Sequence, residues 1–351
     1  MAKLDIDHHK LIYHPERVAE WSANGDCFPI YVEIGLTNRC NHRCTFCALD
    51  WLEHGGKDLD SEVACRNLEN MASNGVKSVM FAGEGEPLLH KDIGKIVKVA
   101  KESGIDVSIT SNGNLFNSNL AQELLPNLSW IRFSIDAGTP ETYALIHGTR
   151  KENFEIVMQN ITSASEIKRN KGYKVTIGTQ ALLTKYSLPE LERLAEILKA
   201  AGADNLQIKP YSHHPSSKND LSFNYEESER LRPAMEKLST PSFQIVYRTN
   251  TINRLQSERE YSKCRGLSFF SLIDASGNVI PCNLFYGNKE DTYGNINEKL
   301  FSEIWSSERR KVVNNQIHNA GIDSCRKGCR LDPINGYLER LKNPESHDNF
   351  I

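Results

Sequence analysis

The sequence predicts an α/β fold, a partial (β/α)6 TIM-like barrel followed by a smaller C-terminal domain. Between residues 30 and 210, short β-rich runs alternate with segments whose apolar residues recur at helical spacing. This alternation is typical of βα units on a parallel sheet. Four predicted helices are followed by a glycine where a C-terminal cap is expected, namely Gly75, Gly104, Gly172 and Gly202. Six units are too few to close an eight-fold barrel, so we expect an open barrel with its site at the C-terminal strand ends.

Each expected element is bounded by a change of pattern. The barrel strands are expected at 30–36, 78–81, 106–110, 130–135, 174–183 and 205–209, and its helices at 63–73, 93–102, 121–125, 154–169 and 188–201. The segment 210–220 is polar, contains two prolines and predicts a loop. After it we expect a helix at 225–238, a strand at 243–248, a hairpin with strands 267–274 and 279–282, and a helix at 301–316.

The expected domains are an N-terminal extension (1–29), the barrel (30–215), a linking helix and strand (216–263), a C-terminal domain (264–335) and a tail (336–351). The chain has 351 residues, 39% hydrophobic and 25% charged, which is enough to bury a sizeable core. A net charge of −3 excludes a bulk attraction to nucleic acid or anionic membranes. Since no run resembles a membrane span or a signal peptide, we expect a cytoplasmic protein.

Nine cysteines point to a metal site or to catalysis, because disulfides are rare in a reducing cytosol. Cys40, Cys44 and Cys47 follow the first predicted strand. Three thiolates this close can each bind one iron of a cubane and leave the fourth iron open. A zinc ion with His42 or His54 as a fourth ligand is the alternative.

The spacing Cys-x3-Cys-x-Phe-Cys at residues 40–47 resembles the signature of the radical S-adenosylmethionine (SAM) superfamily. Residues 83–87, Gly-Glu-Gly-Glu-Pro, resemble the family's Gly-Gly-Glu-Pro element, with Glu84 in place of the first glycine. The third strand ends in Thr-Ser-Asn-Gly at 110–113 and the fourth in Phe-Ser-Ile-Asp at 133–136, which are also similar to family motifs. The resemblance covers about residues 30–210.

The resemblance implies a 4Fe–4S cluster bound by the three cysteines, SAM on the open iron, and a 5′-deoxyadenosyl radical that abstracts a substrate hydrogen. Glycines let the backbone approach a ligand closely, and a carboxylate suits the SAM ammonium. The implied SAM contacts are Phe46, Gly83, Gly85, Glu86, Ser111, Asn112, Ser134 and Asp136. The implied electron donor is a flavodoxin- or ferredoxin-type reductant.

A second cysteine set comprises Cys264, Cys282, Cys325 and Cys329. It resembles the SPASM/Twitch domains that bind auxiliary iron–sulfur clusters in many radical SAM enzymes. A full SPASM domain has about seven cysteines, so four favour the shorter Twitch form, a β-hairpin plus helix with one auxiliary 4Fe–4S cluster. Four thiolates can ligate that cluster fully, which suits electron transfer. A structural zinc site is the alternative.

Basic residues at the last barrel strand and the following loop are the expected catalytic residues, namely Lys209, His213 and His214. They suit a polar or anionic small molecule. The single auxiliary cluster is similar to that of 2-deoxy-scyllo-inosamine dehydrogenases, which predicts oxidation of a sugar, an aminocyclitol or a nucleotide-linked sugar.

Three alternatives to this oxidation remain. One is modification of a ribosomal peptide. The short segment before the first strand, about 30 residues, argues against it, because a peptide-recognition domain needs more. Another is redox-neutral epimerisation or decarboxylation. The third alternative is not an enzyme but a zinc-stabilised binding module.

Overall fold

A ten-stranded sheet organises the protein in the computed structural model, which describes residues 6–219, 221 and 223–350. The strand order is β10-β9-β8-β1-β2-β3-β4-β5-β6-β7, and the strands from β8 to β7 in this order are parallel. The strands are β1 Tyr31–Ile34, β2 Ser78–Phe81, β3 Asp106–Ser111, β4 Trp130–Ser134, β5 Thr176–Leu183, β6 Asn205–Pro210, β7 Gln244–Tyr247, β8 Phe270–Ile273, β9 Asn278–Ile280 and β10 Gly294–Asn295.

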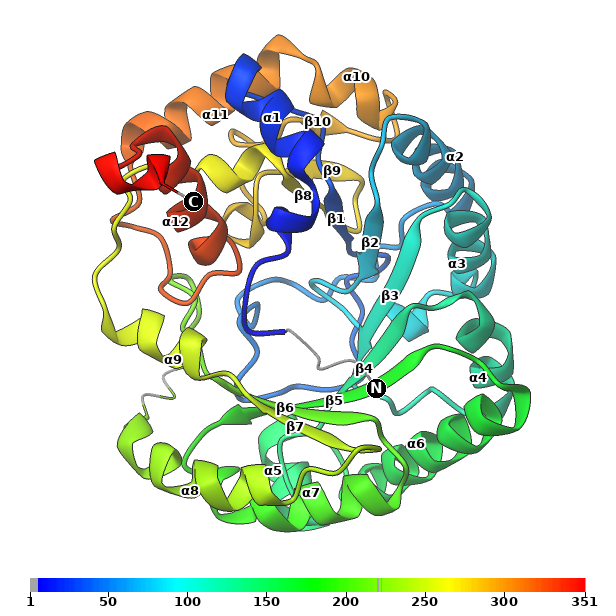
Figure 1. Cartoon of the computed structure of the whole chain (residues 1–351). Coiled ribbons are helices and arrows are strands. Elements are labelled where there is room, and N and C mark those ends of the chain that lie inside the picture. Colours follow the sequence, from blue (N-terminus) through cyan, green and yellow to red (C-terminus); the bar gives the residue numbers. More distant parts are fainter. Residues whose placement is uncertain (1–5, 220, 222, 351) are drawn as a thin grey trace.

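The sheet is curved, and helices lie along its outer side (Figure 1). The helices are α1 Pro15–Asn24, α2 Ser61–Ser73, α3 Ile93–Glu102, α4 Ser118–Leu124, α5 Pro140–His147, α6 Glu152–Lys171, α7 Leu191–Ala200, α8 Tyr225–Lys237, α9 Thr249–Gln256, α10 Phe301–Trp305, α11 Glu308–Ala320 and α12 Asp332–Lys342. Local chemistry sets their ends. For example, the Asp60 carboxylate caps α2 by accepting from the Glu62 and Val63 amides at 2.9 and 3.0 Å.

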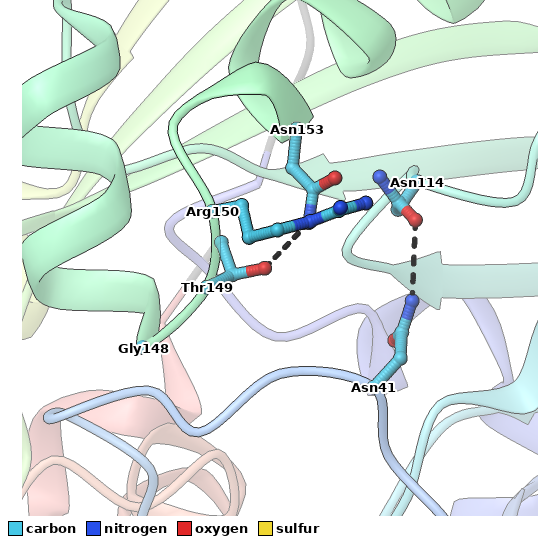
Figure 2. A pocket seen from close by; sticks show the side chains of 6 residues that line it. All are labelled: Asn41, Asn114, Gly148, Thr149, Arg150 and Asn153. Atoms are coloured by element: carbon cyan, nitrogen blue, oxygen red, sulfur yellow. Dashed lines mark hydrogen bonds between the residues drawn. The ribbon is translucent and has the colours of Figure 1, made fainter.

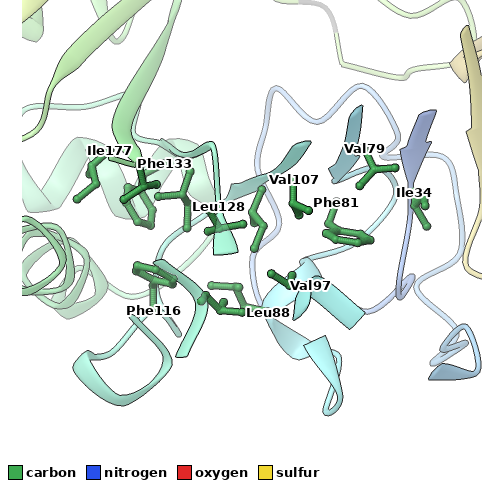
Figure 3. Close-up of a cluster of buried hydrophobic side chains, with 14 of the residues drawn as sticks. Ile34, Val79, Phe81, Leu88, Val97, Val107, Phe116, Leu128, Phe133 and Ile177 are labelled. Atoms are coloured by element: carbon green, nitrogen blue, oxygen red, sulfur yellow. The ribbon is translucent and has the colours of Figure 1, made fainter. Parts of the chain in front are cut away.

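The main core lies between the sheet and the outer helices. Alternate strand residues such as Ile34 and Phe133 belong to this core (Figure 3). Because successive side chains of a strand point to opposite faces, their neighbours Glu33 and Arg132 face the inner side of the curved sheet. The inner face therefore carries polar and charged groups.

The predicted α/β class and its parallel sheet are confirmed, and the six predicted barrel strands end within two residues of the observed ones. The sheet is nevertheless longer than six strands. The strand predicted in the linking region, β7, pairs with β6, and β8 of the predicted hairpin pairs in parallel with β1. The C-terminal region thus extends the barrel sheet.

Four helices were not predicted, namely α1, α5, α9 and α12. The predicted helix at 301–316 is broken into α10 and α11, because the Ser307 hydroxyl caps a new helix by accepting from the Arg310 amide at 3.3 Å. Helix α1 packs against α12 through a small apolar cluster that includes Trp21 and Leu338. None of the helices in the described ranges is long and apolar enough to cross a membrane.

Candidate active site

The cysteines of the first motif lie on the loop after β1. The Thr45 amide donates to the Ile146 carbonyl at 2.8 Å, which holds this loop against α5. Burial, followed by the nearby Cys47 and Cys40 thiols, raises the pKa of Cys44, and burial raises the pKa of Cys40 to about 11. The three sulfurs therefore converge as neutral thiols, and iron would supply the positive charge that stabilises their thiolates.

The second cysteine set converges in the same way from distant parts of the sequence. Burial, followed by Cys329, raises the pKa of Cys282, and Cys264 and Cys325 act in the same direction. The Asn335 amide donates to the Cys264 sulfur at 3.5 Å. These four thiols form one buried site.

The arrangement of the thiols within each cysteine set affects which kind of metal centre the set can bind. Among residues 6–219, 221 and 223–350, no group of three or more His, Cys, Asp or Glu side chains has the geometry to hold a single metal ion. Tetrahedral zinc needs its sulfurs at about 2.3 Å from one ion, whereas each thiolate of a cluster binds a different iron. The fit to a cluster rests instead on the number and spacing of the thiols, three in the first set and four in the second.

Two glycines bring the loop after β2 against the cysteine loop. A Cβ on Gly85 would lie 2.2 Å from the Thr37 carbonyl oxygen and 2.6 Å from that of Arg39, so only glycine permits this approach. Gly83 has φ +119°, and a Cβ there would lie 2.7 Å from the Tyr286 hydroxyl. Both glycines therefore leave open backbone beside the cysteines.

Glu86 ties the ends of two strands together. Its carboxylate accepts from the Ser111 hydroxyl at 2.8 Å, the Asn112 amide at 2.8 Å and the Leu88 amide at 3.1 Å. The Asn112 side chain donates in turn to Asn41 of the cysteine loop at 2.7 Å. Glu86 therefore has internal donors in this structure, and its contact with the SAM ammonium stays a prediction.

His147, which the sequence analysis missed, lies beside Cys44. Its Nε2 lies 3.3 Å from both the amide nitrogen and the carboxylate Oδ2 of Asp136, and its Nδ1 lies 3.6 Å from the Cys44 sulfur. Phe46 packs edge-on against this ring at 5.1 Å. Asp136 is buried, its Oδ1 accepts from the Leu182 amide at 2.6 Å, and its Oδ2 has no hydrogen-bond donor among the described residues. The Thr-Pro start of α5 at residues 139–140 is the helix signal that could have located His147.

The three predicted catalytic residues have different surroundings. Lys209 lies on the inner side of β6, where burial and neighbouring arginines lower its pKa well below that of an ordinary lysine. Ser134 ends β4 on the same side. His214 is buried and contacts the Asn283 carbonyl at 3.2 Å, and His213 is exposed. His214 thus connects two loops. Of the three predicted catalytic residues, Lys209 is the best candidate base.

Glu84 connects the loop after β2 to the C-terminal hairpin. Its carboxylate accepts from the Ala275 amide at 2.7 Å. The buried Tyr286 hydroxyl, which has no hydrogen-bond partner among the described residues, lies close to Gly83. The residue that departs from the family motif therefore joins the two cysteine regions.

We expect the protonation of Glu84 to couple stability to pH. Burial, followed by the nearby Asp274 carboxylate, raises its pKa from 4.5 to about 7. The stabilising contribution of the bound proton is therefore complete below about pH 4.5 and is lost as the pH rises to about 7. Glu84→Gln should remove this dependence, on the order of 1–3 kcal/mol, in unfolding free energies measured from pH 5 to 8. The exposed Glu62→Gln is the control, and an unchanged pH profile for Glu84→Gln would contradict the assignment.

A polar pocket of about 550 Å³ adjoins the cysteine loop (Figure 2). Asn41 forms one wall and bonds to Asn114 at 3.4 Å, and Arg150 and Asn153 form another. A Cβ on Gly148 would lie 2.1 Å from the Arg43 carbonyl oxygen, so this glycine permits the close approach of α5 to the loop. The pocket makes the outer side of the cysteine loop polar.

Comparison with known proteins agrees with both cysteine sites. Residues 34–179 match the radical SAM superfamily, and residues 240–330 match the SPASM iron–sulfur cluster-binding domain. A tungsten-containing aldehyde ferredoxin oxidoreductase cofactor-modifying protein of Pyrococcus furiosus is 26% identical over 85% of this chain and 88% of its own. An Fe-coproporphyrin III synthase of Methanosarcina barkeri is 26% identical over 86% and 81%. A GTP 3′,8-cyclase of Chlorobaculum tepidum is 36% identical, but over only 36% and 38%.

Solved structures share the fold. SuiB of Streptococcus suis bound to S-adenosylmethionine superposes with a TM-score of 0.68 at 19% identity, over 95% of this chain and 79% of that one. Native anSMEcpe with bound AdoMet gives 0.61 at 17% identity, over 90% and 95%. BtrN in complex with AdoMet and 2-DOIA gives only 0.45 at 15% identity, over 84% and 88%. The expected similarity to 2-deoxy-scyllo-inosamine dehydrogenase is therefore distant.

The chain contains a radical SAM domain followed by a SPASM domain. The first domain binds a 4Fe–4S cluster and SAM, and the second binds auxiliary iron–sulfur clusters. A radical SAM domain supports an enzymatic function.

Proposed function

We propose that this enzyme cleaves SAM reductively and oxidises a polar, hydroxylated small molecule, such as a sugar, an aminocyclitol or a nucleotide-linked sugar. The observation that carries the proposal is an apolar contact region between the two cysteine sets. Cys47 of the first set packs into the same cluster as Cys264, Cys282 and Cys329 of the second. Packed side chains that connect two redox centres suit the transfer of an electron between them.

In this proposal the cysteines at 40, 44 and 47 hold the SAM-binding cluster, and the other four hold a Twitch-type auxiliary cluster. When bound, the first cluster and SAM supply the 5′-deoxyadenosyl radical. The backbone at Gly83 and Gly85 and the side chains of Phe46, Ser111, Asn112 and Ser134 would contact SAM. Glu86, Asp136 and His147 would position these groups through the hydrogen bonds described above.

Lys209 is the proposed proton acceptor. For oxidation of a carbinol, the C–H hydrogen would leave as an atom and the hydroxyl proton would pass to the Lys209 amine. Cys264, Cys282, Cys325 and Cys329 would hold the auxiliary cluster, which would supply an acceptor for the remaining electron. Burial and the neighbouring arginines lower the pKa of Lys209, which favours the neutral amine, the form that can accept this proton. Electrons for SAM cleavage would come from a flavodoxin- or ferredoxin-type reductant.

The relatives aligned over most of the chain support a small-molecule substrate. One is named for modifying a cofactor and another for synthesising an iron coproporphyrin. The likeness to SuiB, which has been crystallised with a precursor peptide, is below 20% identity and concerns the fold alone.

Cys282→Ala tests the auxiliary site. We expect wild-type protein, reconstituted without oxygen, to hold about eight irons per chain and the variant about four. The variant should still release 5′-deoxyadenosine but form no oxidised product, because the substrate electron has no acceptor. Cys27→Ala removes a buried thiol outside both sets and should keep all the iron. Equal iron in Cys282→Ala and wild type would refute the assignment.

A further inference from the structure

Basic side chains gather on the inner side of the curved sheet. Arg132 of β4 and Lys209 of β6 face this side, and Arg248 follows β7 beside Lys209, where its amide donates to the Ile208 carbonyl at 2.9 Å. Arg326, next to Cys325, reaches the loop that follows β6, where its Nε and Nη2 donate to the hydroxyl and carbonyl oxygens of Ser212, both at 3.0 Å. Arg132, Arg248 and Arg326 all lower the pKa of Lys209, which indicates that they surround it.

Only some of these cations have acidic partners. Arg248 pairs with Asp7 at 3.4 Å, and Arg330 pairs with Glu33. Within the described part of the chain, no carboxylate forms an ion pair with Arg132 or Arg326. An arginine remains charged at neutral pH, so this excess positive charge is unfavourable unless a ligand balances it.

Unsatisfied polar atoms lie on the same face. Among the residues that the structure describes, the buried Nε of Arg132 has no hydrogen-bond partner, and neither do the buried Oε1 atoms of Gln180 and Gln207, which are register partners on β5 and β6. Arg132 donates from Nη2 to the Thr110 hydroxyl at 3.1 Å, which fixes its orientation. Such groups are nearly always paired in folded proteins, so orphan donors and acceptors together indicate a ligand-binding surface.

We infer that Arg132 and Arg326 bind an anionic oxygen group of the substrate, a carboxylate or a phosphate, beside Lys209. The inference rests on the proposed function, whose substrate class it narrows. Arg132 can donate to either group from its orphan Nε, and Arg326, whose Nε and Nη2 donate to Ser212, can donate from Nη1. The Gln180 and Gln207 oxygens would accept from hydroxyl or amine groups of the same molecule. Because Arg326 adjoins Cys325, the anion would hold the substrate next to the auxiliary cluster.

The test is isothermal titration of the anaerobically reconstituted protein with inorganic phosphate and, separately, with succinate, in low-chloride buffer. We expect saturable binding of at least one anion. The anion with the lower dissociation constant shows whether the site prefers a phosphate or a carboxylate. Arg132→Met and Arg326→Met should each weaken binding by about 10- to 100-fold. Because Arg132 also donates to Thr110 and Arg326 to Ser212, the unfolding temperature of each variant is measured to separate a loss of binding from a loss of folding. Arg193→Met, an exposed site on α7, should bind as the wild type does.

Absence of binding to the wild type, or unchanged binding by both Arg132→Met and Arg326→Met, would overturn the inference. Iron content and 5′-deoxyadenosine release are measured on the same preparations. If the anions bind at these arginines but the protein neither holds iron nor cleaves SAM, the proposed function fails while the anion site stands. If SAM is cleaved but no anion binds, only the anion site fails.

Discussion

Cys44→Ala is expected to abolish SAM cleavage. Cys44 interacts with the other two thiols of its set, and its sulfur lies 3.6 Å from Nδ1 of His147. Without it, one iron would lose its protein ligand, and a cluster held by two thiolates would not be retained. We expect the release of 5′-deoxyadenosine under dithionite to fall more than about 100-fold. The iron content should fall to about four per chain.

Cys65→Ala is the matched control, because Cys65 is a buried thiol of α2 that belongs to neither set. It should retain both the iron and SAM cleavage. If Cys44→Ala cleaved SAM at the rate of this control, the assignment of the first cysteine set would be lost. A stable Cys44→Ala protein that keeps about four irons would instead locate the remaining cluster at the C-terminal set.

Lys209→Met is expected to separate SAM cleavage from substrate oxidation. The variant should still release 5′-deoxyadenosine, because Lys209 is not among the cysteines or the proposed SAM contacts. Product formation should fall by about 10²- to 10⁴-fold, the usual contribution of a general base. The measurement is the ratio of oxidised product to 5′-deoxyadenosine, with the exposed Lys98→Met as control.

The pH profile gives this prediction a second readout. Only the neutral amine can accept a proton, so product formation should rise with pH through the pKa of Lys209. Burial, followed by the charges of Arg132, Arg248 and Arg326, lowers that pKa, so the rise should occur well below the value of about 10.4 for an exposed lysine. Lys209→Arg keeps a positive charge but cannot act as a base. A Lys209→Arg protein with full product yield would exclude Lys209 as the proton acceptor.

The sequence was most informative where local pattern governs structure. Helical and strand periodicity depend on neighbouring residues, so the barrel strands could be located from the sequence. The ends of parallel strands meet at one edge, so motifs at four consecutive strand ends could be expected to share a site. The contact between Asn112 and Asn41 agrees with that expectation. Helix α5 was not predicted, although the Thr-Pro sequence at residues 139–140 is typical of a helix start. His147, the last residue of this helix, was therefore missed as well.

By itself, the sequence determined the fold class, the two cysteine sets and the motifs of a radical SAM domain. Only the tertiary structure decided how these parts are joined. Glu84 meets Ala275, and β8 pairs with β1, through contacts between residues about 190 or more positions apart. The internal partners of Glu86 and the excess of positive charge around Lys209 likewise arise from several strands at once. Burial and charge at a point depend on every segment that reaches it, and no local pattern contains that information.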